Sequence, residues 1–251
     1  MITTIKHPSI SVLITTYKRP KSLLKLLSKL NNQAHIDFSR MEVIVVNDGS
    51  HDSGYVDSYL GYKFPVNYVA MKRREDDRPA YCAAQNLAFS LANNDLIIFF
   101  DDGNFIDDHT LFIHCLYHIL HPDRVAVFAY EASGRDSINE AQEIAIQSPG
   151  DSLVDIWVST GSNSVWAIDW ERVEGFDEWF DGSMGFDDRD FAIRLYEAGV
   201  TLILGDGVTK VSEDQETGGS WTAKVSVEHD HVNGDKFFEK WPKYEGAKWG
   251  K

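Results

Sequence analysis

One stretch of the sequence, residues 95–104, restricts the fold more than any other. It holds an uninterrupted apolar run, Leu96 to Phe100, that stops at two carboxylates, Asp101 and Asp102. An apolar run without polar alternation is typical of a strand covered on both faces, as in the parallel sheet of an α/β domain. Ligands of open α/β sheets bind beyond the carboxyl ends of the strands. We therefore expect a buried strand that ends at a ligand site, where paired carboxylates would suit a hard divalent cation.

A tight turn at Asp102-Gly103, leading into a second strand, is the competing interpretation of this stretch. The next apolar residues are spaced as in a helix, at Leu111, Phe112, Cys115, Leu116 and Ile119. The order strand, loop, helix is therefore predicted rather than a hairpin.

The rest of the sequence alternates between apolar strand-like runs and helix-like segments. In the first half, strands are predicted at 9–16, 41–46 and 66–70, and helices after a cap at Ser22 and at 79–92. In the second half, strands are predicted at 125–130, 153–159 and 165–168, and helices at 186–198 and 235–241. This order predicts a single α/β domain, residues 1–251, with a mostly parallel central sheet, right-handed crossovers and flanking helices.

The charge of the chain restricts its partners. Lys and Arg number 24 against 39 Asp and Glu, which gives a net charge of -15 and argues against nucleic acid or an anionic membrane as the main partner. The two cysteines, Cys82 and Cys115, form no disulfide framework or zinc spacing. No signal peptide and no apolar stretch near the roughly 20 residues of a spanning helix are found. We therefore expect a cytoplasmic protein without a transmembrane segment.

Polar residues follow three of the predicted strands at their carboxyl ends: Thr16-Tyr17, Asp48 and the pair Asp101-Asp102. Ordinary turn chemistry alone would explain Asp48. Their joint placement in one predicted sheet instead favours a single crevice. Neither the dinucleotide fingerprint nor the P-loop is present, so a bound phosphate must be held in another way.

These segments resemble the family 2 inverting glycosyltransferases with the GT-A fold. The similar segments of the first half are Thr15-Thr16-Tyr17, Asp48-Gly49-Ser50, Ala84-Gln85-Asn86 and Phe100-Asp101-Asp102. Gln85 stands where the family has Arg, and Phe100 where it has the first Asp of its Asp-x-Asp motif. In this register Asp102 matches the metal-binding Asp. In the alternative register Asp101 comes first and Gly103 leaves the third position empty.

The second half is similar to the same family. Its matching segments are Thr160-Gly-Ser-Asn163, Gly175-Phe-Asp-Glu178, Asp187-Asp188 and Val227-Glu-His229. The resemblance implies that Asp188 is the catalytic base and that His229 completes a metal site. For Asp190, which also lies in the first turns of the 186–198 helix, we expect an ion pair with Arg194 four residues on.

The resemblance implies a complete set of roles. Residues 1–104 form a nucleotide-binding half and 105–251 an acceptor-binding half with a closing C-terminal segment. Mn²⁺ or Mg²⁺ is held by Asp102 and His229. The donor, a nucleoside-diphosphate sugar with UDP as the family's commonest carrier, contacts Thr16, Tyr17, Asp48, Arg78, Asn86, Asp101 and Asp102. The acceptor, a glycan or other hydroxyl compound, contacts Trp157, Gly161 and Asp187. The expected activity is hexosyl or N-acetylhexosaminyl transfer in polysaccharide biosynthesis.

Several alternatives stay open at this point. A glycoside hydrolase would use two Asp residues and need no nucleotide or metal. A non-catalytic binding module for sugar nucleotides or carbohydrate would explain the departures at Phe100 and Gln85. His114 and His118 have the spacing of a helical zinc pair without the Glu of a metalloprotease, and we interpret them as a helix surface. The tryptophans from Trp157 to Trp179 fit either acceptor stacking or the core.

Overall fold

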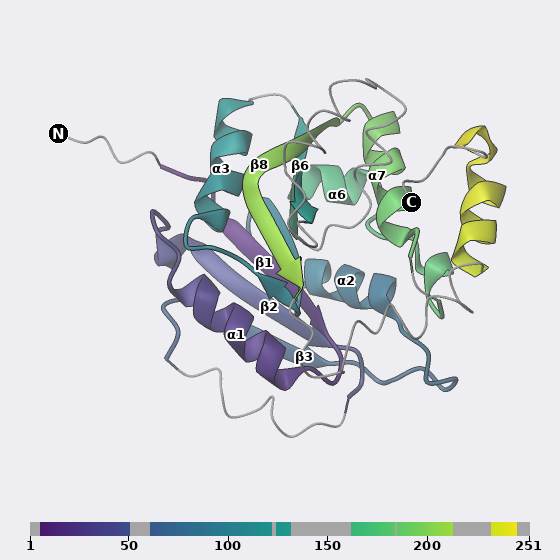
Figure 1. The fold of residues 1–251 in the computed structure, drawn as a ribbon, viewed down its shortest axis with the longest axis horizontal. Coiled ribbons are helices and arrows are strands. Elements are labelled where there is room, and N and C mark those ends of the chain that lie inside the picture. The colour runs from purple at the N-terminus through teal and green to yellow at the C-terminus, as the bar shows by residue number, and fades with distance from the viewer. Residues whose placement is uncertain are drawn as a thin grey trace.

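A central sheet with helices on both faces forms the protein, as a computed structural model shows for residues 6–50, 61–121, 124–131, 162–183, 185–212 and 232–244 (Figure 1). The strands follow the order β3-β2-β1-β4-β7-β6-β8-β5. The first four are mutually parallel: β1 (Ile10–Thr16), β2 (Met41–Asn47), β3 (Val66–Ala70) and β4 (Leu96–Asp101). The predicted α/β fold with a mostly parallel sheet is therefore confirmed.

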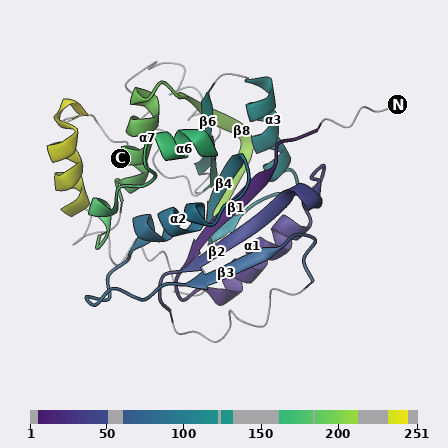
Figure 2. The same cartoon turned by 180° about the vertical axis from the view of Figure 1, so that it is seen from behind.

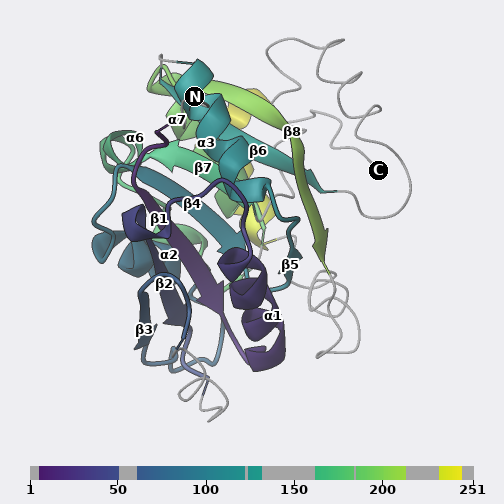
Figure 3. The same ribbon diagram turned by 90° about the vertical axis from the view of Figure 1, so that its left-hand side faces the viewer.

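The second half of the sheet contains one reversed central strand. β7 (Ser162–Trp166) runs antiparallel to both of its neighbours, β4 and β6 (Val125–Glu131). β8 (Thr201–Ser212) returns to the parallel direction beside β6. The two-residue strand β5 (Asn104–Phe105) pairs with β8 at the end of the sheet (Figure 3). A turn at Asp102-Gly103 does lead into a second strand, so the predicted order of strand, loop and helix is wrong in that detail. Because β5 pairs with β8 and not with β4, no hairpin forms there, as predicted.

The helices divide between the two faces of the sheet. α1 (Pro20–Asn31) and α3 (Thr110–Leu120) lie on one face. α2 (Tyr81–Ser90), α6 (Ala167–Arg172) and α7 (Asp187–Glu197) lie on the other, seen from behind in Figure 2. A last helix, residues 232–240, packs beside α7 through Phe237 against Phe186. Short 3₁₀ turns lie at Phe38–Arg40, Glu178–Phe180 and Pro242–Tyr244.

The pleat of β4 gives each helical layer its own core. Phe99 belongs to the core under α2, α6 and α7, where it meets Trp170 at 5.4 Å between ring centroids. Phe100 belongs to the core under α1 and α3. The same alternation holds in β1, where Leu13 faces the α2 side and Ile14 the α1 side. The side chains that follow at the carboxyl ends of these strands therefore also belong to different sides of the sheet.

The helix ends agree with the sequence in part. α7 stops at Gly199, whose φ of +81° is the left-handed conformation that glycine adopts without a Cβ penalty. α1 begins at Pro20 with Arg19 as its N-cap residue, so the prediction that Ser22 caps it is wrong; Ser22 is buried inside the helix. Proline suits the first position because its missing N–H has no intrahelical partner there.

Three further predictions about the second half need correction. Residues 165–168 were expected as strand, but β7 ends at Trp166 and α6 begins at the next residue. β8 was not expected at all. His114 and His118 do not lie on a helix surface: both are buried and bond to Ser162 and Ser164 on β7. The predicted strand at 153–159 lies outside the described residues. Within the described residues, no helix is long and apolar enough to cross a membrane.

Candidate active site

A group of acids gathers on the α2 side of the sheet, at the carboxyl end of β4. Asp101 ends β4 and accepts a hydrogen bond of 3.4 Å from the hydroxyl of Tyr81, the first residue of α2. Burial raises the pKa of Tyr81 well above its usual value, and the nearby charges of Asp101, Asp188 and Asp187 raise it further. Tyr81 therefore keeps its proton. Because Asp101, Asp187 and Asp188 all raise the pKa of the same hydroxyl, the three acids lie close to one another.

Asp187 and Asp188 are held there by the start of α7. The N-cap residue, Phe186, has a φ of 66°, which turns the chain sharply into the helix. Burial raises the pKa of Asp187 to about 7, and repulsion from Asp101, Asp181 and Asp190 adds to the effect. Near neutral pH the neutral and charged forms of the Asp187 carboxyl are therefore both populated.

Asp190 lies on the same helix but faces the protein interior. Its side chain is 0% exposed and accepts from Arg194 Nε at 2.8 Å, Lys240 Nζ at 2.7 Å and Trp241 Nε1 at 2.8 Å. The predicted ion pair with Arg194 is confirmed. The structure extends it, because Lys240 and Trp241 attach the C-terminal helix to α7 through the same carboxylate.

Asp48 anchors a second polar group, at the carboxyl end of β2. Its carboxylate pairs with Arg73, which also donates to the Asp48 carbonyl at 3.2 Å and to the Asp77 carboxylate at 3.2 Å. The guanidinium carbon of Arg73 lies 4.0 Å from the centre of the Tyr17 ring. The second carboxylate oxygen, Asp48 Oδ1, is buried and has no hydrogen-bond partner among the described residues. Unpaired buried acceptors are costly, so a ligand N–H is the natural partner for this one.

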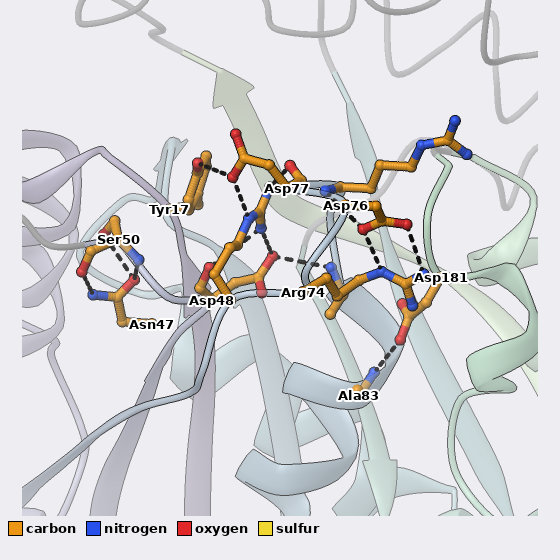
Figure 4. Close-up of polar contacts among 12 residues, drawn as sticks. Tyr17, Asn47, Asp48, Ser50, Arg74, Asp76, Asp77, Ala83 and Asp181 are labelled. Atoms are coloured by element: carbon orange, nitrogen blue, oxygen red, sulfur yellow. Dashed lines mark hydrogen bonds and ion pairs between the residues drawn. The ribbon is translucent and has the colours of Figure 1, made fainter.

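Two carboxylates from distant parts of the chain, Asp48 and Asp181, meet the N-terminus of α2 (Figure 4). Asp48 accepts from the N–H of Ala80 at 3.0 Å. Asp181, just before α7, accepts from the N–H groups of Cys82 at 2.8 Å and Ala83 at 3.2 Å. The N-cap residue of α2 provides no side-chain cap, so two distant carboxylates supply it instead. The residues at the carboxyl end of β2 and those before α7 are thus fixed to one helix end.

Asp102, next to Asp101, has partners at the end of β1 and the start of α1 rather than on α2. One carboxylate oxygen accepts from the Thr16 hydroxyl at 2.7 Å and the other from Arg19 at 3.2 Å. The residue is only 4% exposed, and this burial raises the pKa of Asp102 to about 6, against the opposing effects of Arg19 and Thr16. Asp102 follows the last residue of β4 and meets Thr16 and Arg19, whereas Asp101 meets Tyr81 of α2. Repulsion from Asp101 still adds to the raised pKa of Asp102.

The described residues do not fit a metal ion at Asp102. Both of its oxygens already have protein partners, one of them a cation. Among the parts of the chain that the structure describes, no group of three His, Cys, Asp or Glu side chains is arranged to hold a metal. His229, the second expected ligand, lies outside the described residues.

The other predicted site residues have varied surroundings. Asn86 donates to the Phe176 carbonyl at 2.8 Å and accepts from its N–H at 2.8 Å, so its amide braces the 175–178 turn. Arg78 is exposed, and its backbone N–H bonds to Asp76. Trp157 and Gly161 lie outside the described residues. Of the other tryptophans, Trp170 is in the core and Trp179 is 44% exposed.

Sequence reasoning missed three residues of this region: Tyr81, Arg19 and Asp181. Gln85, found in place of an expected arginine, could have drawn attention to Tyr81, since it donates to the Tyr81 hydroxyl at 3.0 Å from one turn further along α2. Arg73 lies in a basic loop, residues 72–74, yet only 11% of its side chain is exposed. Gly49 explains this burial: a Cβ there would lie 2.5 Å from the Cβ of Arg73.

Comparisons with known proteins agree with this arrangement. The sequence matches the family described as Glycosyl transferase family 2 over residues 11–168. A comparison with curated protein sequences found no match.

Among solved structures, a mannosyltransferase of Pyrobaculum calidifontis, PcManGT, in complex with GDP-Man and Mn²⁺ is similar with a TM-score of 0.66 and 16% identity, over 92% of this chain and 66% of that one. TarS of S. aureus has a TM-score of 0.63 and 18% identity, over 79% of this chain and 36% of that one. TarS 1–349 in complex with UDP-GlcNAc has a TM-score of 0.65 and 17% identity, over 84% and 61%. The chain thus spans less than two thirds of the length of each. At these identities the likeness confirms the predicted GT-A fold alone.

Proposed function

Because the chain belongs to glycosyl transferase family 2, we propose that it transfers a sugar from a nucleoside-diphosphate sugar to a hydroxyl group of an acceptor. The acceptor we propose is a glycan. The observation that carries the proposal is the buried, unpartnered oxygen of Asp48, whose other carboxylate oxygen pairs with Arg73. A nucleobase can donate a ring N–H to that oxygen, next to the guanidinium of Arg73 that lies over Tyr17.

The acids across the α2 N-terminus supply the chemistry. Asp188 is proposed as the base that takes the proton of the acceptor hydroxyl. The freed oxygen attacks the anomeric carbon, the bond to the nucleoside diphosphate breaks, and the configuration inverts in one displacement. Asp187 is proposed to orient the acceptor hydroxyl. Asp101, held by Tyr81, faces the same space. No step in this scheme passes through a metal ion, since the residues around Asp102 do not fit one.

UDP is our first choice of carrier, with GDP as the alternative. Both uracil and guanine present a ring N–H next to a carbonyl. Asp48 can accept a hydrogen bond from that N–H, and Arg73 can donate one to the carbonyl oxygen. The solved relatives carry UDP-GlcNAc in one case and GDP-Man in the other. Hexosyl and N-acetylhexosaminyl donors both remain within the proposal.

The test is to titrate UDP, GDP, ADP and CDP into the protein by isothermal titration calorimetry. The titration is then repeated on the Asp48→Asn variant with whichever nucleotide binds the wild type. We expect UDP or GDP to bind and the variant to bind at least tenfold more weakly. Transfer from the corresponding nucleotide sugars to glycan acceptors is then measured with Asp188→Asn as the inactive control. Equal binding of all four nucleotides, or none, would refute the donor site. Release of sugar from a glycan without any nucleotide would instead identify a hydrolase.

A further inference from the structure

We propose that Asp102 is the buried anchor of Arg19 rather than a ligand for a divalent cation, so that a nucleoside diphosphate binds this chain without a cation at that carboxylate. The inference rests on the proposed function in one respect, that a nucleoside diphosphate is the ligand. It concerns the carboxylate that sequence comparison would assign to metal binding.

The first argument is the direction of the side chains. Asp101 follows Phe99 on the α2 side, and Tyr81 holds it there. Asp102 follows Phe100 on the α1 side and meets Thr16 and Arg19. Paired parallel strands point their matched residues to the same side, and Thr15 is matched with Asp101. Gln85 of α2 reaches Thr15 at 3.5 Å, which agrees with this assignment.

The register of the motif follows from these directions. The residue that faces the acids of α7 is Asp101, so it takes the first position of an Asp-x-Asp motif. Asp102 then takes the middle position, and Gly103, which has no side chain, takes the third. In this register the third position of the motif, which would provide the metal-binding carboxylate, is occupied by a glycine without a side chain. The structure favours the alternative register over the one in which Asp102 comes last.

The second argument is that Asp102 already has its partners. Its two oxygens are used by Thr16 at 2.7 Å and Arg19 at 3.2 Å, and its side chain is 6% exposed. A cation arriving at Asp102 would have to displace the guanidinium of Arg19. The ion pair also cancels the charge of Asp102. The negative charge of Asp102 therefore does not repel a diphosphate that approaches the end of β4. No metal ion is needed to neutralise Asp102, because Arg19 already does so.

Two measurements on the full chain test the inference. UDP is titrated by calorimetry in the presence of a chelator and in the presence of Mn²⁺. Bound Mn²⁺ is measured separately, without nucleotide and with it, by electron paramagnetic resonance for the wild type and for Asp102→Asn. We expect UDP affinities within about threefold of each other in the two conditions, which is less than 1 kcal/mol. We also expect Asp102→Asn to leave the amount of bound Mn²⁺ unchanged.

Arg19→Gln provides the reciprocal variant. Once Arg19 is gone, Asp102 is a buried carboxylate without its cation, so we expect Arg19→Gln to lower the unfolding free energy and to bind no more Mn²⁺ than the wild type. The double variant Arg19→Gln/Asp102→Asn should recover part of that loss of stability, because no uncompensated charge is left. Gain of Mn²⁺ in Arg19→Gln that disappears in the double variant would overturn the inference, since Asp102 would then be a metal ligand held back only by Arg19.

The outcomes separate the two proposals. Bound Mn²⁺ in the wild type that disappears in Asp102→Asn would overturn the inference, as would UDP binding that is abolished by the chelator and restored by Mn²⁺ only when Asp102 is present. Failure of every nucleotide to bind would refute the proposed donor site, while the Mn²⁺ measurements would still decide the role of Asp102.

Discussion

Two aspartates two residues apart on α7 should behave in opposite ways when each is changed to asparagine. Asp188 lies with Asp101 at the carboxyl end of β4 and is proposed to take a proton during transfer. Asp190 is fully buried, pairs with Arg194 within α7 and joins α7 to the C-terminal helix through Lys240. Because asparagine keeps the size of the side chain, each substitution removes mainly the charge and a proton acceptor.

The expected loss of stability for Asp190→Asn follows from its partners. Removing one member of a buried ion pair costs about 3–5 kcal/mol, because a buried charge is left uncompensated. Lys240 keeps Asp177 at 2.6 Å, and Arg194 keeps the carbonyl of Val173, so part of this cost is avoided. We therefore expect about 3 kcal/mol, at the lower end of that range. For a chain of this length, that corresponds to a melting temperature lower by about 6–12 °C.

Urea denaturation, thermal melting and transfer kinetics measure both variants. Asp190→Asn should unfold earlier but transfer sugar at near the normal rate below its melting temperature. Asp188→Asn should melt at or above the wild-type temperature and bind donor normally, while transfer falls by about 10²- to 10⁴-fold. Near-normal transfer by a folded, donor-binding Asp188→Asn protein would refute its role as base. A large loss of transfer in Asp190→Asn without a loss of stability would show that Asp190, and not Asp188, has the catalytic role.

Three further predictions concern the same region. Asp187→Asn should raise the unfolding free energy at pH 8 but hardly at pH 4, because a carboxyl whose folded pKa is raised to about 7 costs the fold stability progressively as the pH rises from its unfolded pKa of about 4 to about 7; urea melts that show equal gains at both pH values would contradict this. Arg73→Gln leaves Asp48 without its cation, so it should cost about 3 kcal/mol in urea melts and weaken nucleotide binding, whereas Lys72→Gln, an exposed neighbour, should do neither. Asp181→Ala should cost about 1 kcal/mol and speed amide hydrogen exchange at Cys82 and Ala83, and unchanged exchange there would rule out its capping role.

The strands of the first half could be predicted because each is an apolar run bounded by polar residues. β4 stops at Asp101 as expected, and the end of α7 follows from Gly199. β8 escaped prediction because its apolar residues follow a helix closely and then continue into Gly205 and Gly207, which weaken a strand pattern. α6 is only six residues long, too short for helical periodicity to show.

The site was harder to predict than the fold for a physical reason. The pattern of β4 reveals that Asp101 and Asp102 point to opposite sides, but it does not say which side carries the acids of α7, since both faces of the strand are apolar. That choice depends on where the distant α2 and α7 pack. The burial of His114 likewise depends on serines of β7, which lie 48 and 50 residues away in the sequence.

The cap that Asp181 places on α2 also affects the order in which the site is completed during synthesis. Asp181 is joined to the chain 99 residues after Cys82. At about 5–20 residues per second, this takes about 5–20 s. Until then, the first turn of α2, which carries Tyr81, has only Asp48 as a side-chain cap among the described residues. Strands β1 to β4 of a nascent chain can therefore pair before the N-terminus of α2 has both of its caps. A fragment released before residue 181 would contain those paired strands without a finished α2 N-terminus.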